Sequence, residues 1–553
     1  MNTDRRQAWM IGPKEPVTGE SAVASSQSPL VTDVVLETMR KGGNAIDAGI
    51  AGCLVQAGTQ QHLTNHAGTV TLLYYEAATG ETHELNSWGT VVQGLAPFRR
   101  LPGRVAEPIA SPVAAIPGYI PGLGAMHERF GTMAWSELCQ PAIHWAEEGH
   151  YVTPFESFWL QSDYVDMYLY TESGREHFAP GGLTPALGER FRKPALATTM
   201  RRLAEEGPEH FTTGGWAEDF VKRGNDLGWN VKLEHMKQIA PRWGKGLRYT
   251  FRDNEIVQLS SPEVAGVFSA MTLGILDKLD VEPLGHFTES PEALAYLALT
   301  LRWVEQQMSF LKDPLIFEDA AETLMSADFH QHGADLIRRS RPKIDLTEHM
   351  LISHGRAAVA AAGASSWREV SLGTAAISIV DGQGNWAQIT HTSQGGGIPG
   401  EVVNGVSMRG YNTTQRINSM LETWFTGGAR GRAIVGNTFV MRDGEPIWQL
   451  GMPSRPQMFM PQILANRLIW GMDHYTAEDT PRLYQGVTDD YRVLAEARFP
   501  GSVVAGLVKK GMLLDPLKPY TVNVGSTQMA WRGDDGRLHA VTTPRDEGAA
   551  GGF

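Results

Sequence analysis

Apolar residues recur at helical spacing over much of the first two thirds of the chain. Thr32 can cap a helix that begins with Val34, and the run Lys41-Gly42-Gly43-Asn44 ends it with a basic last turn and a glycine. Asn44 can then cap a second, buried helix over 45–55. Residues 1–20 carry no such pattern and are expected to form a loose arm. Further helices are predicted over 122–130, 135–149, 195–206, 264–279 and 291–311.

Strand patterns alternate with these helices. Residues 69–76 (TVTLLYYE) are β-branched and aromatic and lie between Gly68 and Gly80, which is typical of a strand. Residues 374–392 alternate on both sides of a Gly-Gln-Gly-Asn turn, which predicts a β-hairpin. Strands mixed with a long helical middle indicate a layered α/β or α+β protein.

The hairpin brings hydroxyl groups together. If Gly382 pairs with Asn385, Thr374 lies opposite Ser393 and beside Thr392. A threonine hydroxyl is a weak nucleophile and needs a base, which its own α-amine can provide when threonine is the first residue of a chain. This chemistry requires a cut between Gly373 and Thr374, and the featureless stretch before them could be cut without loss of a core.

Composition excludes several classes of function. The formal charge is −13, and no basic run occurs, so nucleic acid and anionic membranes are not expected partners. Only Cys53 and Cys139 are present, too few for a disulfide framework or a cysteine metal site. The first residues lack the apolar core of a secretory signal, and no apolar run reaches membrane-spanning length. A cytoplasmic location is therefore expected.

Short motifs in a fixed order extend over almost the whole chain. The sequence resembles the gamma-glutamyltranspeptidase family of N-terminal-nucleophile (Ntn) hydrolases, whose GGNAxDA signature is similar to residues 42–48. The other motifs that carry the resemblance are Pro117-Gly118, Gly122, His127, Phe130-Gly131, Trp135, Pro141-Ala142, Glu148-Gly149, Asp313-Pro314, Pro481-Arg482, Gly525-Ser526-Thr527-Gln528 and Pro544-Arg545.

The resemblance implies a site and a fold. Thr374 falls on the family's nucleophile, at the start of a T-x-x-x-S-x-V-D pattern, and Thr392 falls on the second threonine that hydrogen-bonds it. The implied fold is an α+β, four-layer αββα sandwich, formed jointly by a large subunit, residues 1–373, and a small subunit, residues 374–553.

The residues with which the family binds a glutamyl group are absent from the matching positions of this sequence. The arginine expected after residues 85–86 appears as Trp88, and the acidic pair expected after Met408 appears as Arg409-Gly410. The paired serines expected before Thr438 appear as Ala433-Ile434. A site that lacks such partners discriminates against a zwitterionic substrate, so glutathione is not the expected substrate.

The oxyanion segment also differs from the family pattern. The glycine pair whose amides form the oxyanion hole appears as Ser454-Arg455, where backbone amides can still serve. Arg409 and Arg455 could recognise a carboxylate on a small acyl group, or be solvated or paired with surface acids. Gln394 could hydrogen-bond an acyl or amino group, or serve only the loop.

Two other signals are set aside. Residues 395–400 match G-x-G-x-x-G, but Pro399 and Gly405 break any following helix, so a flexible loop is expected there and not a dinucleotide site. His62 and His66 have i,i+4 spacing without an adjacent glutamate, which is weak support for zinc. His391 falls on the hairpin face opposite Thr392 and is expected to be structural.

The predicted function is a self-processing amidohydrolase that acts on a small, carboxylate-bearing acyl compound, with an oxamate-amidohydrolase-like activity as one possibility. Transfer of a gamma-glutamyl or other acyl group to an amine is one alternative, and a non-catalytic binding protein with the same fold is another. No metal or organic cofactor is implied. The expected partners are a small-molecule amide and the two subunits of one precursor, and a homodimer of the processed heterodimer stays open.

Overall fold

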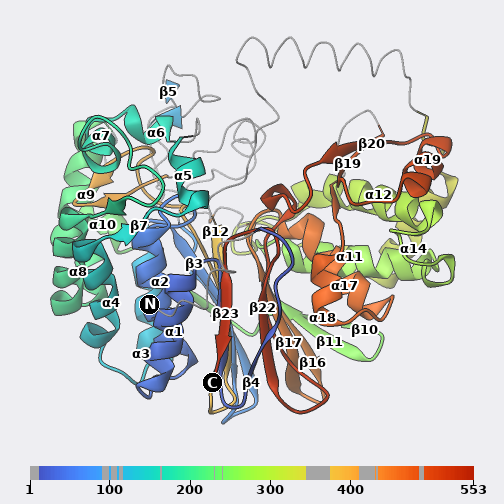
Figure 1. The fold of residues 1–553 in the computed structure, drawn as a ribbon, viewed down its shortest axis with the longest axis horizontal. Helices are drawn as coiled ribbons and strands as arrows, with labels where there is room; N and C mark the ends of the chain where they lie inside the picture. Colours follow the sequence, from blue (N-terminus) through green and yellow to red (C-terminus); the bar gives the residue numbers. More distant parts are fainter. Residues whose placement is uncertain are drawn as a thin grey trace.

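Two seven-stranded antiparallel sheets lie face to face at the centre of the protein (Figure 1). The computed structural model describes residues 11–89, 99–100, 109–110, 116–161, 165–228, 231–239, 241–343, 374–409, 430, 434–484 and 491–553. The first sheet has the order β23 (Ala549–Gly552), β2 (Val23–Ser26), β12 (Thr374–Val380), β13 (Trp386–Thr392), β3 (Thr69–Glu76), β4 (Glu81–Asn86), β9 (Arg242–Gly244).

The second sheet faces the first. Its order is β1 (Val17–Gly19), β22 (Leu538–Thr542), β21 (Gln528–Arg532), β17 (Glu445–Met452), β16 (Gly436–Arg442), β11 (Asn254–Gln258), β10 (Leu247–Phe251). Residues on both sides of position 373 contribute strands to each sheet. Strands from before and after position 373 are therefore neighbours within each sheet.

Helices cover the outer face of each sheet (Figure 1). The first sheet packs on α1 (Pro29–Arg40), α2 (Ala45–Thr59), α3 (Tyr119–Phe130), α4 (Trp135–Glu148) and α8 (Pro194–Glu206). The second sheet packs on α11 (Ala265–Lys278), α12 (Pro291–Glu305), α14 (Ala327–Arg339) and α17 (Pro456–Leu468). A third hydrophobic core lies between the sheets. These layers confirm the predicted αββα sandwich.

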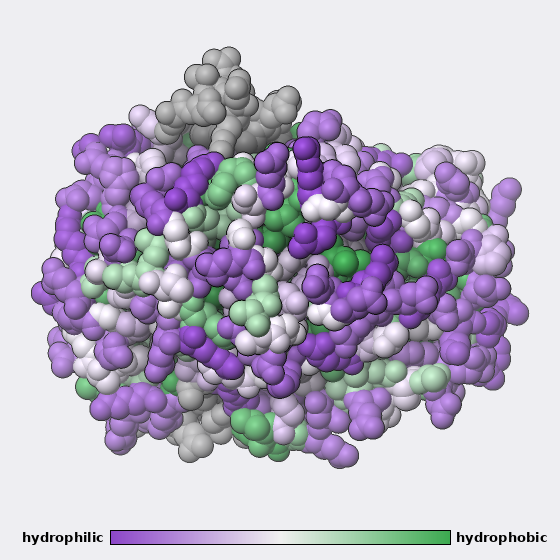
Figure 2. Space-filling model, turned by 90° about the horizontal axis from the view of Figure 1, so that it is seen from below, coloured by the Kyte–Doolittle hydropathy of each residue, from purple (hydrophilic) through white to green (hydrophobic). Residues whose placement is uncertain are grey.

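Smaller elements complete the two halves. They include α5 (Pro154–Leu160), α6 (Asp166–Leu169), α7 (Glu172–Phe178), α9 (Gly215–Asp226), α10 (Leu233–Met236), α13 (Ala321–Leu324), α18 (His474–Asp479), α19 (Gly501–Lys509), and the strands β5 (Arg99–Arg100), β6 (Ile109–Ala110), β7 (His150–Tyr151), β8 (Arg190–Phe191), β14 (Val402–Val403), β15 (Val406–Ser407), β18 (Leu483–Tyr484), β19 (Arg492–Glu496) and β20 (Leu513–Leu517). Polar side chains cover most of the lower face, with apolar residues in small groups between them (Figure 2).

Most predicted elements are confirmed, but two predictions near the start are wrong. The first helix is capped by Ser28, not Thr32, because Pro29 is well suited to the first helical position; Thr32 instead donates to the Ala549 carbonyl at 2.9 Å. The arm is also not entirely loose, since Val17 pairs with Ala540 at the edge of the second sheet. Residues 1–10 lie outside the described residues.

Candidate active site

The hairpin β12–β13 carries the proposed nucleophile, and its register differs from the prediction. Thr374 pairs with Thr392, not with Ser393. The reason lies in the turn, where Asp381 pairs with Asn385 and its carboxylate accepts from the amides of Gln383 and Asn385 at 2.9 and 3.0 Å. This carboxylate closes a three-residue loop, and the extra residue shifts the pairing by one.

The corrected register places two hydroxyls in direct contact. Thr374 Oγ1 donates to Thr392 Oγ1 at 3.1 Å, and the backbone N–H of Gln394 donates to the same Thr392 oxygen at 3.2 Å. Thr374 is 8% exposed and Thr392 1%. Among the described residues, no carboxylate or imidazole is recorded as a hydrogen-bond partner of Thr374 Oγ1. A free α-amine at Thr374 would lie on the same residue as this hydroxyl.

Alternate side chains of the hairpin point to opposite faces of the first sheet, one toward the helices and one toward the second sheet. Ile377 and Ile379 pack on the helices outside the first sheet, whereas Val380 packs between the sheets. Thr374 shares the parity of Val380, so its side chain faces the second sheet. His391 has the opposite parity and contacts Thr64 Oγ1 and the Tyr119 hydroxyl at 3.0 Å each. Burial lowers the pKa of His391 to about 3, so the imidazole is neutral and its contacts are made on the helix side of the first sheet.

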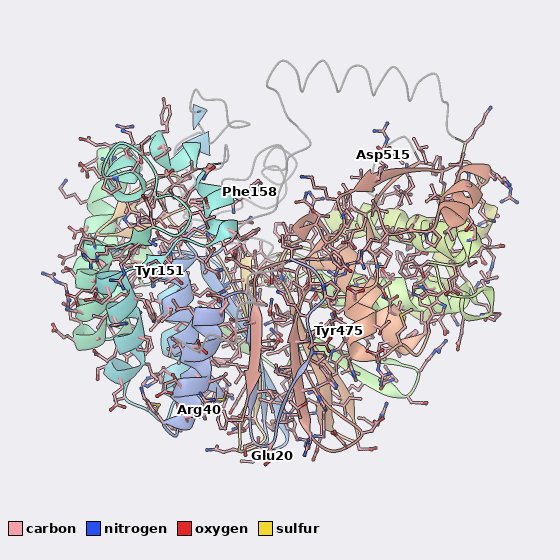
Figure 3. All side chains as sticks on the ribbon, viewed as in Figure 1. Glu20, Arg40, Tyr151, Phe158, Tyr475 and Asp515 are labelled. Atoms are coloured by element: carbon pink, nitrogen blue, oxygen red, sulfur yellow. The ribbon has the colours of Figure 1, made fainter. Side chains whose placement is uncertain are left out.

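Thr374 lies at the upper end of the sheets. Glu20, in the turn before β2, marks the lower end in Figure 3. Because Val23 pairs with Val380 and Ser26 with Ile377, β12 begins at the opposite end from Glu20. Phe158 and Asp515 label the upper parts of the two halves in the same view. β12, the strand that begins with Thr374, therefore starts between the upper parts of the two halves.

The predicted oxyanion segment follows a strand of the second sheet that faces the nucleophile strand. Gln449 Nε2 of β17 donates to the Ile379 carbonyl at 2.9 Å, and a Cβ built on Gly451 would lie 3.1 Å from the Ala376 Cβ. β17 ends at Met452, and Ser454 follows two residues later.

Ser454 and Arg455 adopt a backbone conformation that favours glycine. Their φ values are 68° and 54°, so two side-chain-bearing residues stand in the left-handed region, at a cost of roughly 1 kcal/mol each. Both residues therefore hold a conformation that glycine adopts without strain, at the positions where the resemblance expects a glycine pair. Arg455 is also the residue before α17, and its guanidinium lies 4.7 Å from the centre of the Tyr484 ring.

Trp88 does not occupy an open pocket. It is 2% exposed and belongs to the core between the sheets. A Cβ atom on Gly395 would come within 2.8 Å of the Trp88 ring, and one on Gly396 within 2.1 Å of the Ala67 carbonyl oxygen. The glycine loop is therefore packed closely beside the hairpin. Residues 402–407 continue it as the strands β14 and β15, so the rejection of a dinucleotide helix is confirmed.

Arg409 is a buried cation near the hydrophobic cluster that contains the residue after Thr374. It is 7% exposed, and its charge opposes the rise that burial causes in the pKa of Tyr168. Tyr168 belongs to a hydrophobic cluster that includes Ala375, the residue after the nucleophile. Arg409 thus lies near Tyr168 in the half that covers the first sheet, whereas Arg455 precedes α17 in the half that covers the second sheet. Gly373, Gly410 and Ala433 lie outside the described residues.

The fold also places a cation that sequence reasoning missed. Arg430 is 4% exposed, and its Nη1 donates to the Asn86 carbonyl at 2.6 Å. Asn86 ends β4 and precedes Trp88, so a guanidinium stands close to where the resemblance expected an arginine. No local pattern around Arg430 could have indicated this, because its partner is 344 residues away.

The two histidines considered for zinc are part of the interior. His62 contacts the rings of Phe155 and Trp159, and His66 Nε2 lies 3.1 Å from the Leu54 carbonyl oxygen. Within the described part of the chain, no three His, Cys, Asp or Glu side chains form a group that could hold a metal ion. The described helices also include none with the length and apolarity to cross a bilayer.

Comparison with known proteins decides the family. The family model for gamma-glutamyltranspeptidase matches residues 31–553. The chain belongs to the gamma-glutamyltranspeptidase family. It is therefore an Ntn-type enzyme, a threonine hydrolase or acyltransferase.

Relatives of this gamma-glutamyltranspeptidase family member cover almost its full length. The glutathione hydrolase proenzyme of Pseudomonas aeruginosa is 24% identical over 557 residues, 93% of this chain and 91% of the relative. The acylase ACY 1 proenzyme of a Pseudomonas species is 23% identical over 520 residues, 90% and 88% of the two chains. The crystal structure of cephalosporin acylase from Bacillus halodurans superposes with a TM-score of 0.81 at 21% identity, and covers 98% and 97%. This last likeness shows the fold.

A buried acid joins the two predicted subunits near the site. Glu547 is 4% exposed and accepts from Thr153 Oγ1 and from the Phe155 amide, both at the start of α5. Burial raises its pKa to about 7. Glu547 lies two residues before β23, whose Ala549 pairs with Ser26 of β2, and β2 pairs with β12.

Glu547→Gln is expected to make stability less dependent on pH. Below about pH 4.5 the Glu547 carboxyl is protonated in both the folded and the unfolded protein. Between about pH 4.5 and 7 this carboxyl ionises only in the unfolded chain, so the wild-type free energy of unfolding falls as pH rises. The neutral amide avoids this loss, so the variant should gain roughly 1–3 kcal/mol relative to wild type from pH 4.5 to 8. Urea midpoints of both proteins at the two pH values check this; an equal difference at both would contradict it.

Proposed function

We propose that the enzyme is a self-processing amidohydrolase in which Thr374 is the nucleophile. The contact between Thr374 and Thr392 at the start of β12 is the observation that carries the proposal. In the precursor, Thr374 Oγ attacks the carbonyl of Gly373. The new C–O bond replaces the C–N bond, and the nitrogen receives the proton that the hydroxyl loses. Water then cleaves this ester and leaves residues 1–373 and 374–553 as two chains.

The mature enzyme repeats this chemistry on a small amide. Thr374 Oγ attacks the amide carbonyl, and the freed α-amine takes the hydroxyl proton and passes it to the leaving nitrogen. Thr392 orients the nucleophile through the 3.1 Å contact. Backbone amides at Ser454 and Arg455 stabilise the oxyanion, and their left-handed backbone supports this role. Water completes hydrolysis, whereas an amine in its place gives acyl transfer.

The acyl group of the substrate carries a carboxylate. Arg409 follows Met408 and is largely buried, Arg455 is part of the proposed oxyanion segment, and arginine binds carboxylates through two parallel hydrogen bonds. Gln394, two residues after Thr392, is the proposed contact for the acyl or amino group, and buried Trp88 stands where the resemblance expects a glutamyl-binding arginine. An oxamate-like compound fits this combination of a short acyl chain and one negative charge.

Ammonia release from a panel of small amides tests this proposal. We expect amides that carry a carboxylate, oxamate among them, to react at least about tenfold faster than neutral amides of equal size. Arg409→Gln or Arg455→Gln should remove that preference while leaving the slow reaction of neutral amides unchanged. Equal rates for charged and neutral amides, or a preference for a γ-glutamyl amide, would contradict the proposed substrate class.

A further inference from the structure

Gln27 occupies the position where β2 stops pairing with the nucleophile strand. β2 ends at Ser26, which pairs with Ile377 of β12, and Ser28 already caps α1. The backbone carbonyl of Gln27 has turned away and accepts from Gln60 Nε2 at 3.2 Å. The chain therefore leaves the sheet at Gln27, level with Ala376 and two positions short of the start of β12 at Thr374.

The side chain of Gln27 takes over the missing backbone contact. Its Oε1 accepts from the Ala376 amide at 3.0 Å, although Gln27 is 349 residues away in the sequence and only 3% exposed. Alternate amides of a strand point to the same edge, so the nitrogen of Thr374 faces the edge that the Ala376 nitrogen faces. Gln27 thus binds the Ala376 amide, which is the neighbour of the Thr374 nitrogen along that edge. The Thr374 nitrogen is the proposed base.

Gln27 is itself fixed from the second sheet. Its Nε2 donates to Ser526 Oγ at 2.8 Å, so its amide group is oriented with the oxygen toward β12. Ser526 follows Gly525, and a Cβ built on Gly525 would lie 3.3 Å from the Ser454 carbonyl oxygen. One buried side chain therefore connects the strand of the nucleophile with the loop that supports the proposed oxyanion segment.

We propose that Gln27 is a positioning residue for the Thr374 nucleophile, an inference that rests on the function proposed above. Cutting the chain before Thr374 would make β12 a free end, and free strand ends fray. β13 holds that end along one edge, and beyond Ser26 the backbone of β2 no longer holds the other. Gln27 supplies the remaining contact and keeps Thr374 opposite Thr392 during self-cleavage and turnover.

The rate of self-cleavage measures this role without a known substrate. Precursor is made in a short cell-free pulse, and its conversion to two chains is followed on a denaturing gel. Gln27→Leu removes the oxygen that accepts from the Ala376 amide and leaves that amide buried without this acceptor. A displacement of the nucleophile by about 1 Å can lower the rate about 10²-fold. We therefore expect cleavage to slow by about 10–100-fold, and Gln27→Glu, which keeps an acceptor oxygen, to recover most of the rate.

Gln449→Leu is the matched control. Gln449 is also a buried glutamine whose side chain contacts the backbone of β12, at Ile379, five residues from the nucleophile. Its loss should lower the melting temperature about as much as Gln27→Leu and leave the cleavage rate close to wild type. If both variants slow cleavage equally, the effect of Gln27 is general destabilisation and the positioning role is refuted.

Two further variants keep every outcome decisive. If Gln27→Leu aggregates, Ser526→Ala removes only the hydroxyl that orients Gln27, and cleavage at the wild-type rate would then overturn the proposal. Thr374→Ala is run in parallel. Normal cleavage of that variant would refute the proposed function itself, whereas an uncut Thr374→Ala beside a normally cleaved Gln27→Leu refutes the positioning role alone.

Discussion

Thr374→Ala is expected to leave the polypeptide uncut and to lower the rate of amide hydrolysis by at least about 10³-fold. The substitution removes the only atom that can form the ester with residue 373, and it changes little else, because Thr374 is nearly buried and Ala375 and Ala376 already follow it. Gel electrophoresis of aged protein and ammonia release from the best amide of the panel check the two parts.

Conservative variants show whether the hydroxyl is responsible. Thr374→Ser retains the nucleophilic oxygen and should cleave itself, though more slowly. Thr392→Val retains the shape of the neighbouring residue and loses the oxygen that contacts Thr374, so it should slow cleavage without preventing it. Cleavage of Thr374→Ala at the wild-type bond and rate would show that another group attacks.

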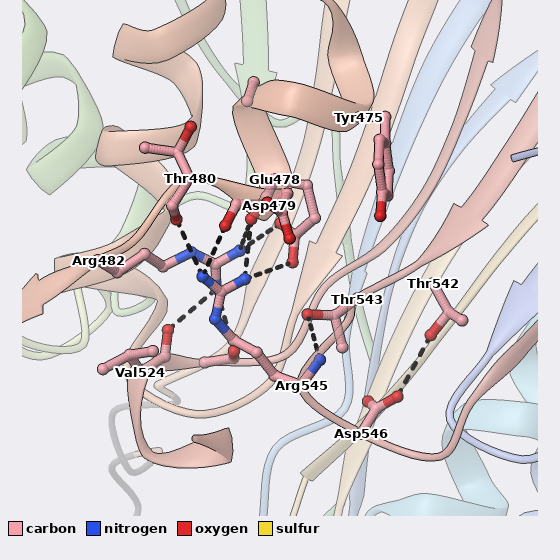
Figure 4. A network of polar contacts seen from close by, with 12 residues as sticks. Tyr475, Glu478, Asp479, Thr480, Arg482, Val524, Thr542, Thr543, Arg545 and Asp546 are labelled. Atoms are coloured by element: carbon pink, nitrogen blue, oxygen red, sulfur yellow. Dashed lines mark hydrogen bonds and ion pairs between the residues drawn. The ribbon is translucent and has the colours of Figure 1, made fainter. Parts of the chain in front are cut away.

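Arg545→Leu is expected to cause the largest loss of stability among single substitutions outside the site. Arg545 is fully buried and forms ion pairs with Glu478 and Glu496 at 3.4 and 2.7 Å (Figure 4). Burial by itself would raise the pKa of Glu496, and the Arg545 guanidinium outweighs this and holds the pKa below its usual range. Removal of one partner from a buried ion pair costs about 3–5 kcal/mol, since the other charges stay buried.

The loss should appear as a fall of about 3–4 °C in melting temperature, because the unfolding entropy of so long a chain is large. Arg537→Leu is the control, because Arg537 is 58% exposed and its carboxylate partner Glu20 lies 4.0 Å away, so its loss should change stability by less than about 0.5 kcal/mol. Equal melting temperatures for Arg545→Leu and Arg537→Leu would contradict the role assigned to the buried network.

This network also reaches toward the site. Arg482 ion-pairs with Glu478 in the same cluster, and its Nη1 donates to the carbonyls of Val524 and Gly525 at 2.9 and 3.0 Å (Figure 4). A Cβ built on Gly525 would lie 3.3 Å from the Ser454 carbonyl oxygen, so the two loops are close neighbours. The buried charges therefore support the loop that backs the proposed oxyanion segment, and Arg545→Leu should slow self-cleavage as well as destabilise the fold.

Local sequence patterns predicted the elements well and their junctions less well. The strand Thr69–Glu76 and the helix that Asn44 caps follow from periodicity and capping alone. The hairpin was predicted, but its register was wrong by one residue, because Asp381 closes the turn with side-chain hydrogen bonds that alternation cannot reveal. The correction strengthens the site, since it places Thr392 directly opposite Thr374.

Contacts between distant parts of the chain could not be predicted. Gln27 and Arg430 have no distinguishing sequence context, and each acquires its role from a partner more than 300 residues away. The left-handed backbone at Ser454 and Arg455 could not be predicted from the sequence either, because serine and arginine disfavour that conformation. Such features follow from the packed sheets and depend on the whole fold.

The most direct measurement is the amino-terminal sequence and intact mass of purified, active protein. The account predicts two chains, of which the smaller has 553 − 373 = 180 residues and begins Thr-Ala-Ala-Ile-Ser. An active protein that consists of one unbroken polypeptide, with no chain beginning at Thr374, would contradict it.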